Sequence, residues 1–431
     1  MIVNTDSLIR KNKFFGYLIG IKVLLKQEKN IYNLINFETL TFMLDFTNTK
    51  TAFAGKTDKE LRRAAFLFGF LFRPWVKSLA VFFLRIAMWM HLPIRWAVKP
   101  LIFRQFCGGE TLSECTLAIQ KLSISHIYSI PDYSAEGLKT PAGFSAAYDE
   151  ILSAIRYSKD NQHIPFAVFK PSSLVPVYIL EKVSSDIPLD EKENLLFVEF
   201  RTRLRNIAET CITNNLRLLI DAEEYASQKA VDDLVEEMME TYNKESAFIF
   251  NTLQMYRHDR LYYLKQLNEK AKNKNYYLGI KLVRGAYMEK ERARAKALGY
   301  PSPIQPDKAS TDAMYDEALT FLTEQINHTI IFCGTHNEKS VQHLISLMNE
   351  KGLSEDDKRV WFSQLYGMSD HISYNLSYAG YQVAKYLPYG PVKLVIPYLL
   401  RRANENSSVK NQAGREELLL KNEIKRRKNT L

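Results

Sequence analysis

Eight short runs of apolar, β-branched and aromatic residues recur from about residue 124 onward, and each leads through polar residues into a segment with helical periodicity. Strands that alternate with helices in this way form a parallel sheet. Eight such units predict a closed (β/α)8 TIM-like barrel, since an open doubly wound sheet usually has a glycine-rich first turn. The chain contains neither GxGxxG nor GxxxxGK. The runs are SHIYSI, PFAVFK, LRLLID, AFIFNT, LGIKLV, TIIFCG, VWFSQL and VAKYLP.

The 431-residue length leaves room for such a barrel and for accessory segments. Met43 is a second candidate start of translation, because a more regular region begins after it. We expect an uncertain N-terminal extension at 1–42, a helical and partly amphipathic region at 43–122, the catalytic barrel at 123–410 and a charged tail at 411–431.

Residues 65–103 form the most apolar stretch, but cations interrupt it, so no uncharged run reaches the roughly 18 to 20 residues that cross a bilayer. On a helix these cations would share about a third of the circumference. The segment then either lies on an anionic membrane surface with its basic face toward the headgroups, or packs against the barrel as short helices broken by prolines. The cations are Arg73, Lys77, Arg85, Arg95 and Lys99.

The net charge of +10 favours anionic partners in general. Most cations lie in mixed runs such as EFRTRLRNIAE, which resemble solvated helix faces rather than a stripe that tracks phosphates, so we expect no nucleic-acid partner. The four cysteines are far apart and lack metal-ligand spacing, which predicts a reducing, cytoplasmic location and no metal site.

Polar residues end most of the eight runs, and in a barrel the carboxyl ends of the strands form the active site. One such residue alone is more often a loop anchor or a helix N-cap, and Asp221 and Asn337 stand at cap positions. The whole set, however, predicts one polar pocket. Its members are Lys170, Asp221, Gln254, Thr335, His336, Asn337 and Gln364.

The fifth run continues as IKLVRGAYMEK, with two cations, a glycine and a tyrosine near the strand end. On a strand Lys281 faces one side, whereas Leu282 and Arg284 face the other. Cations here can hold a pyrophosphate or a cofactor carbonyl, and Gly285 permits close approach of the backbone to a ligand. For Arg284 alone, a solvated loop is the simpler interpretation.

After the eighth run, the segment KYLPYGPVKLVIPYLLRRANEN predicts a helix with one functional face. Tyr398, Arg401, Arg402 and Glu405 stand at i, i+3, i+4 and i+7. Two adjacent guanidiniums can grip a carboxylate with planar forks, which lysines cannot do with the same directionality. Because the helix is otherwise apolar, we expect it to be buried against the barrel.

The motifs FKPSSL, IDAEE, TLQMYR, KLVRGAY, GTHN, QLYGM, YLPYG and YLLRRANEN, in this order, resemble the landmarks of the proline dehydrogenase family from about residue 104 to residue 408. The resemblance implies a monofunctional enzyme that uses FAD to oxidise L-proline to 1-pyrroline-5-carboxylate, the first step of proline catabolism. Hydride would pass to the flavin N5 and electrons onward to a membrane quinone. A peripheral position on the inner face of the cytoplasmic membrane would serve that last step.

The resemblance also implies roles for single residues. Lys170, Asp221 and Tyr398 would be catalytic, and the substrate would contact Lys170, Leu282, Tyr386, Tyr398, Arg401, Arg402 and Glu405. The cofactor would contact Gln254, Lys281, Arg284, Gly285, Tyr287, Thr335, His336, Asn337 and Gln364. Bacterial relatives usually have arginine where Lys281 stands and lysine where Arg284 stands, so the charges are kept but exchanged.

Three alternatives remain open. A hydroxyproline dehydrogenase would be expected to have a smaller residue at Tyr386, so this sequence favours proline. A Schiff-base aldolase would use Lys170 or Lys281 at a strand end. A non-enzymatic, basic binding protein would account for the charge alone.

Overall fold

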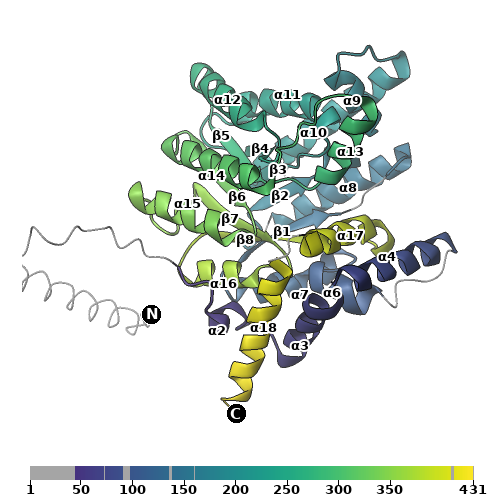
Figure 1. Ribbon diagram of the computed structural model, residues 1–431. Coiled ribbons are helices and arrows are strands. Elements are labelled where there is room, and N and C mark those ends of the chain that lie inside the picture. The colour runs from purple at the N-terminus through teal and green to yellow at the C-terminus, as the bar shows by residue number, and fades with distance from the viewer. Residues whose placement is uncertain are drawn as a thin grey trace, which may run out of the picture. The chain divides into compact units, whose positions relative to one another are not determined.

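Eight parallel strands form the centre of the structure, in the order β1-β8-β7-β6-β5-β4-β3-β2 (Figure 1). The computed structural model describes residues 44–71, 73–90, 98–134, 138–159, 161–408 and 412–430. All eight predicted runs are strands, and the predicted barrel is confirmed. The strands are β1 (Tyr128–Tyr133), β2 (Phe166–Phe169), β3 (Arg217–Ile220), β4 (Ile249–Gln254), β5 (Leu278–Val283), β6 (Thr329–Gly334), β7 (Val360–Leu365) and β8 (Val383–Tyr389).

The two ends of this sheet, β1 and β2, nearly close the barrel. The backbone N–H of Ser129 donates to the carbonyl of His163 at 2.8 Å, just before β2. Farther along, Lys170 Nζ lies 3.1 and 3.0 Å from the two carboxylate oxygens of Asp132. A backbone bond and an ion pair therefore join the strands at this seam.

Alternation along the strands separates an inner layer from an outer one. The inner layer has an aromatic floor in which the Phe166 ring meets Phe250, Phe332 and Trp361 edge-on, with centroids 5.7, 5.1 and 4.9 Å away. Residues two positions further along the same strands stay on the inner face. The side chains at the carboxyl ends of the strands are therefore aimed into the mouth above this floor.

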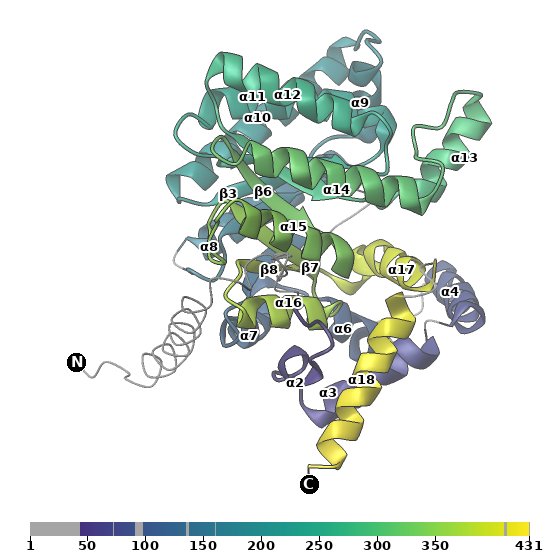
Figure 2. The ribbon, with the colours of Figure 1, turned by 60° about the vertical axis from the view of Figure 1, so that its left-hand side comes forward.

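Helices connect the strands and cover the outer layer (Figures 1 and 2). Capping boxes at Thr57 and Asp190 fix the starts of two of the helices. The helices around the barrel are α8 (Pro141–Ser158), α9 (Val177–Ser184), α10 (Glu191–Thr213), α11 (Tyr225–Tyr242), α12 (Arg260–Lys274), α13 (Met288–Leu298), α14 (Lys308–Glu324), α15 (Glu338–Glu350), α16 (Asp370–Tyr378) and α17 (Val392–Ser408).

The C-terminal segment, expected as a charged tail, forms a packed helix, α18 (Gln412–Lys428). This helix lies against α3 (Asp58–Phe66) in both views (Figures 1 and 2). Its Leu419 and Leu420 are buried, and Glu423 is buried beside the cations that neutralise it. The helices that precede the barrel are α2 (Thr49–Ala52), α3 (Asp58–Phe66), α4 (Pro74–Trp89), α6 (Arg104–Phe106) and α7 (Leu112–Ser123), with π-helical turns at Leu67–Leu71 and Lys99–Phe103.

The end of α3, the π-helical turn after it, and α4 with the residue that follows it expose a set of large apolar side chains, which we call the α4 ridge. Trp75 is 63% exposed and Met90 is 54% exposed. The spacing along α4 places its members on one helical face. None of the described helices combines the length and the apolar composition needed to cross a membrane. The ridge comprises Phe66, Phe70, Trp75, Leu79, Phe82, Ile86 and Met90.

Candidate active site

Polar side chains from β1, β5 and β8 and from the residues that directly follow β2 and β3 meet above the aromatic floor. We call this group the mouth network: Asp132, Lys170, Asp221, Lys281 and Tyr386. Lys170 Nζ lies 3.0 Å from Asp132 and 3.5 Å from Asp221. Lys281 Nζ lies 2.6 Å from Asp221 Oδ1 and donates to the Tyr386 hydroxyl. That hydroxyl is 3.5 Å from the same Asp221 oxygen. Three predicted strand-end residues, Lys170, Asp221 and Lys281, are thus brought together.

Each buried ammonium group of the mouth network lies beside a carboxylate, and this pairing offsets the cost of removing the charges from water. Burial tends to raise the pKa of Asp221, but Lys281 and Lys170 more than offset it, and the pKa falls below its usual value. Burial lowers the pKa of Lys281 against the opposing effect of Asp221. Burial, together with Asp221 and Asp132, raises the pKa of Tyr386 well above its usual value. Asp221 is therefore a carboxylate and Tyr386 a neutral phenol that can donate a hydrogen bond.

Asp132 was not predicted as a site residue. It follows the first apolar run by two positions and stands on the inner side of β1, in line with Ile130. Its side chain is buried and also accepts a 2.9 Å hydrogen bond from the hydroxyl of Ser134. Extending the strand alternation past the end of the run would have placed it in the mouth.

The predicted alternation along β5 holds, and it separates residues that were expected to share one site. Lys281 points into the barrel, whereas Leu282 is fully buried in the layer between the strands and the helices. Neighbouring strand residues face opposite sides, so Leu282 does not share the inner face with Lys281, and its contact with the substrate stays a prediction.

Arg284 also lies on the outer side, in contact with α14 and α15 rather than in a solvated loop. Its guanidinium donates to Asp312 at 2.7 Å, Thr335 at 2.6 Å and Ser340 at 2.9 Å. It lies 4.4 Å from the centroid of the Tyr315 ring. Arg284 thus links the end of β5 to the end of β6.

Two other predicted cofactor contacts have structural partners. Asn337 caps α15, since its side chain accepts from the backbone N–H of Lys339 at 2.9 Å. The amide of Gln364 donates to the carbonyl of Thr335 at 3.0 Å and accepts from Ser373 Oγ at 2.7 Å. These bonds hold the ends of β6 and β7 together.

His336 follows β6 and is kept neutral. Its Nδ1 lies 2.9 Å from Ser369 Oγ, and its Nε2 lies 3.5 Å from the backbone nitrogen of Leu365. The backbone N–H can only donate, so we assign the ring proton to Nδ1. Burial lowers the pKa of His336 to about 3, helped by the positive charges of Lys385 and Arg402.

This neutral histidine predicts a pH-dependent stability. In the unfolded chain His336 binds a proton below about pH 6.5, whereas in the fold it stays neutral down to about pH 3. The unfolded state therefore binds more protons in this window, and the free energy of unfolding falls as the pH drops below 6.5, by up to about 1.4 kcal/mol per unit. Between pH 7.5 and pH 5, wild type should lose about 2 kcal/mol more than His336→Gln in urea unfolding. Equal losses would contradict a neutral His336.

The helix α17 brings two arginines to the same end of the barrel. The guanidinium of Arg401 lies 5.7 Å from the centroid of the Tyr287 ring, just after β5, and that of Arg402 lies 4.9 Å from the Tyr398 ring. Arg402 is only 7% exposed, and its charge acts on His336 at the end of β6. The side chain of Glu405 lies outside the described residues.

Two further predicted contacts line the ends of β4 and β5. Gln254 is buried, and its Oε1 has no hydrogen-bond partner among the described residues. Gly285 has φ +125°, and a Cβ there would lie 2.5 Å from the Tyr256 ring, so only glycine fits.

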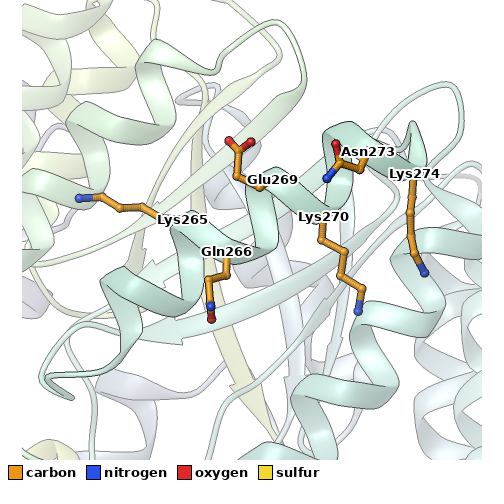
Figure 3. Close-up of a pocket in the computed structure, with 6 residues that line it drawn as sticks. All are labelled: Lys265, Gln266, Glu269, Lys270, Asn273 and Lys274. Carbon is orange, nitrogen blue, oxygen red and sulfur yellow. The ribbon is translucent and has the colours of Figure 1, made fainter.

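A hollow on the outside of α12 has no part in this site (Figure 3). Its cations are paired with neighbouring helices: Lys265 with Glu317, at 3.1 Å, and Lys274 with Glu240, at 2.7 Å. Such solvated pairs are typical of a helix surface. The lining residues are Lys265, Gln266, Glu269, Lys270, Asn273 and Lys274.

Comparison with known proteins identifies the family to which the chain belongs. The proline dehydrogenase family model matches residues 115–415. The carbapenem antibiotics biosynthesis protein CarD of Pectobacterium carotovorum subsp. carotovorum is 36% identical over 75% of this chain and 83% of its own length. The mitochondrial proline dehydrogenase 1 of Caenorhabditis elegans is 35% identical over 75% of this chain, which spans 54% of that enzyme. The hydroxyproline dehydrogenase of Xenopus laevis is 34% identical over 77% of this chain and 79% of its own length.

Among solved structures, proline utilization A from Bdellovibrio bacteriovorus, inactivated by N-propargylglycine, superposes with a TM-score of 0.65. It is 20% identical and covers 73% of this chain and 34% of that one, which supports the fold alone. Together, the match of the family model and the curated relatives show that this chain belongs to the proline dehydrogenase family of enzymes.

Proposed function

We propose that this chain oxidises L-proline to 1-pyrroline-5-carboxylate with FAD as the cofactor, the first step of proline catabolism. The observation that carries the proposal is the pair Arg401 and Arg402, which lies beside Tyr287 and Tyr398 at the end of the barrel where the mouth network lies. Proline has three groups that suit this site. Its carboxylate suits the two guanidiniums, its amine suits the polar side chains at the strand ends, and its apolar ring suits the aromatic side chains.

The residues at the strand ends fit FAD. Gln254 has a buried amide oxygen that no described residue satisfies, and a polar isoalloxazine edge can supply the missing donor. Lys281 places positive charge in the mouth, and His336 and Gln364 fix the ends of β6 and β7. The bound group would supply a two-electron acceptor. Arg284 would act mainly by holding Thr335, since protein oxygens already occupy three of its donors.

The protein's part in the reaction is to bind and orient the substrate. Arg401 and Arg402 would hold the carboxylate, while Tyr386 and Tyr398 confine the ring. The substrate amine must be neutral, because its lone pair forms the C=N bond as the ring carbon farther from the carboxylate loses hydride. Lys170 and Asp221 would set the charge around that nitrogen.

A hydroxyproline dehydrogenase is the second candidate, since one of the relatives has that name. The position of Tyr386 argues against it. The hydroxyl of Tyr386 bonds to Lys281, and its ring lies against Phe332 with a centroid distance of 6.2 Å. We expect this fixed side chain to hinder a substrate ring that carries an added hydroxyl group. We expect kcat/KM for proline to exceed that for 4-hydroxyproline by at least about tenfold, because a single hydroxyl group that fits poorly typically lowers kcat/KM by that factor.

We further propose that the electrons pass to a membrane quinone while the enzyme lies peripherally on the inner face of the cytoplasmic membrane. The exposed α4 ridge supports this contact. The sequence predicted a basic face toward the headgroups, whereas the exposed side chains of the ridge are apolar. Residues 61–109 contain no Asp or Glu and several Lys and Arg. Apolar side chains flanked by cations suit an anionic lipid surface.

The α4 ridge can be tested by exchanging two of its members. Trp75→Ser with Leu79→Ser should lower binding to anionic phospholipid vesicles by at least about tenfold, because each side chain loses part of the 1.5–3 kcal/mol of its burial. Sedimentation with vesicles measures the change. The control is Leu117→Ser, since Leu117 is 77% exposed but stands on α7, away from the ridge. Binding that is unchanged by the double substitution would remove the ridge from the membrane contact.

A further inference from the structure

We propose that the C-terminal helix α18 positions His336 in the active site, acting through Glu416 and Ser369. The inference rests on the proposed function, since it assigns to α18 a role toward the cofactor-binding end of the barrel. Helix α18 begins more than 70 residues after His336 in the chain. The link between them runs through the loop between β7 and α16.

Ser369 is the centre of the link, because its hydroxyl forms a hydrogen bond with His336 and not with the backbone of its own helix. It stands at the N-cap of α16, where a serine side chain usually accepts from a backbone N–H of the first turn. Here no such bond is made, and Ser369 Oγ lies 2.9 Å from His336 Nδ1. The N-cap hydroxyl is therefore used to orient the imidazole.

Glu416 of α18 holds Ser369 in an unusual backbone conformation. Ser369 has φ +51°, a left-handed conformation that is costly for residues other than glycine and persists only where neighbours enforce it. Its backbone N–H donates to Glu416 Oε2 at 3.2 Å. Glu416 is only 4% exposed, so it is placed by the packing of α18.

The neighbouring residue on α18 secures the same contact from a second side. Arg415 binds Glu338 of α15 with two bonds, of 2.9 and 3.0 Å. Glu338 in turn lies 3.0 Å from His371 Nε2, and the other ring nitrogen of His371 is 3.6 Å from Glu416. Glu416 therefore bonds to Ser369 directly, whereas Arg415 ties α18 to α15 and, through Glu338 and His371, to the first turn of α16.

The rest of this loop is fixed by buried bonds, so that a change at Glu416 should act locally. Asp370 lies 2.8 Å from both Lys385 and Lys56. The side chain of Gln105 donates to the carbonyl of Gly367 at 2.8 Å. With these anchors in place, losing the bond to Glu416 should free the turn at Ser369 without releasing the loop.

The first test compares substitutions in the link with a matched one on the same helix. Ser369→Ala removes the hydroxyl, and Glu416→Gln weakens the hold on the turn. The control is Glu423→Gln, because Glu423 is also buried on α18 but forms its ion pairs with Arg426 and Arg427 of the same helix. The ring nitrogens of His336, observed by ¹⁵N NMR on the full chain and assigned with His336→Gln, report the tautomer.

We expect Nδ1 to be the protonated nitrogen in wild type and in Glu423→Gln, and a mixture of tautomers in Ser369→Ala. FAD affinity should fall about fivefold to tenfold in Ser369→Ala, in line with one lost hydrogen bond, and less in Glu416→Gln. Unchanged His336 signals in Ser369→Ala would overturn the proposal, as would equal perturbation by Glu423→Gln. If Glu416→Gln does not fold, Ser369→Ala still decides. Absence of flavin from wild type would remove the proposed function but leave the NMR result valid.

Discussion

Replacing Arg402 by methionine is expected to lower kcat/KM for proline about a thousandfold. A guanidinium that binds a carboxylate through charged hydrogen bonds contributes roughly 1.5–3 kcal/mol per bond, and two such bonds correspond to about 4 kcal/mol or about 10³ in rate. Arg402→Lys keeps the charge but loses the planar fork, so an intermediate loss of about tenfold to a hundredfold is expected. Steady-state kinetics with proline measures both.

The control for this prediction is Arg201→Met, which removes an exposed arginine that pairs with Glu237 at 2.9 Å on the outer helices. It should change kcat/KM less than twofold, since surface pairs contribute little. If Arg402→Met retained a third or more of the wild-type kcat/KM, Arg402 would not be a carboxylate ligand.

Replacing Asp221 by alanine is expected to lower the free energy of unfolding by about 3–5 kcal/mol, because the change leaves two buried ammonium groups without their shared carboxylate. Lys281 and Lys170 lie 2.6 and 3.5 Å from Asp221, and Lys281 is only 5% exposed. Asp221→Ala with Lys281→Met removes one buried charge of each sign and should recover part of the loss. Urea unfolding of the four proteins forms a complete double-mutant cycle.

The matched control is Asp233→Ala, which removes an exposed aspartate paired with Lys229 on α11. It should cost less than about 0.5 kcal/mol. A loss below about 1 kcal/mol in Asp221→Ala, or no recovery in the double variant, would contradict the description of the mouth network as mutually compensating buried charges.

The barrel was predictable because its signal is local: each strand is a short apolar run with polar ends. Strand alternation also predicted which residues share a face. The same rule, carried through, separates Leu282 from Lys281 and brings Asp132 into the mouth. Asp132 was missed because the first run was ended at Ile130, two residues before it.

Other features depend on contacts between distant parts of the chain and left no local signal. The partners of Arg284 are 28 to 56 residues away. The segment of α18 is rich in charge, so it resembled a solvated tail, yet Glu416 and Glu423 are buried beside groups that neutralise them. The sequence left open whether residues 65–103 lie on a membrane surface or pack against the barrel, and only the tertiary structure shows that Trp75 and Met90 are exposed.

The central claim is that the strand ends hold a flavin that proline reduces, and an anaerobic titration followed by visible absorption tests it most directly. The purified protein should be yellow, and proline should bleach the flavin band, whereas the same concentration of 4-hydroxyproline should bleach it far more slowly. A colourless protein that cannot be loaded with FAD, or a bound flavin that stays oxidised in excess proline, would contradict the account.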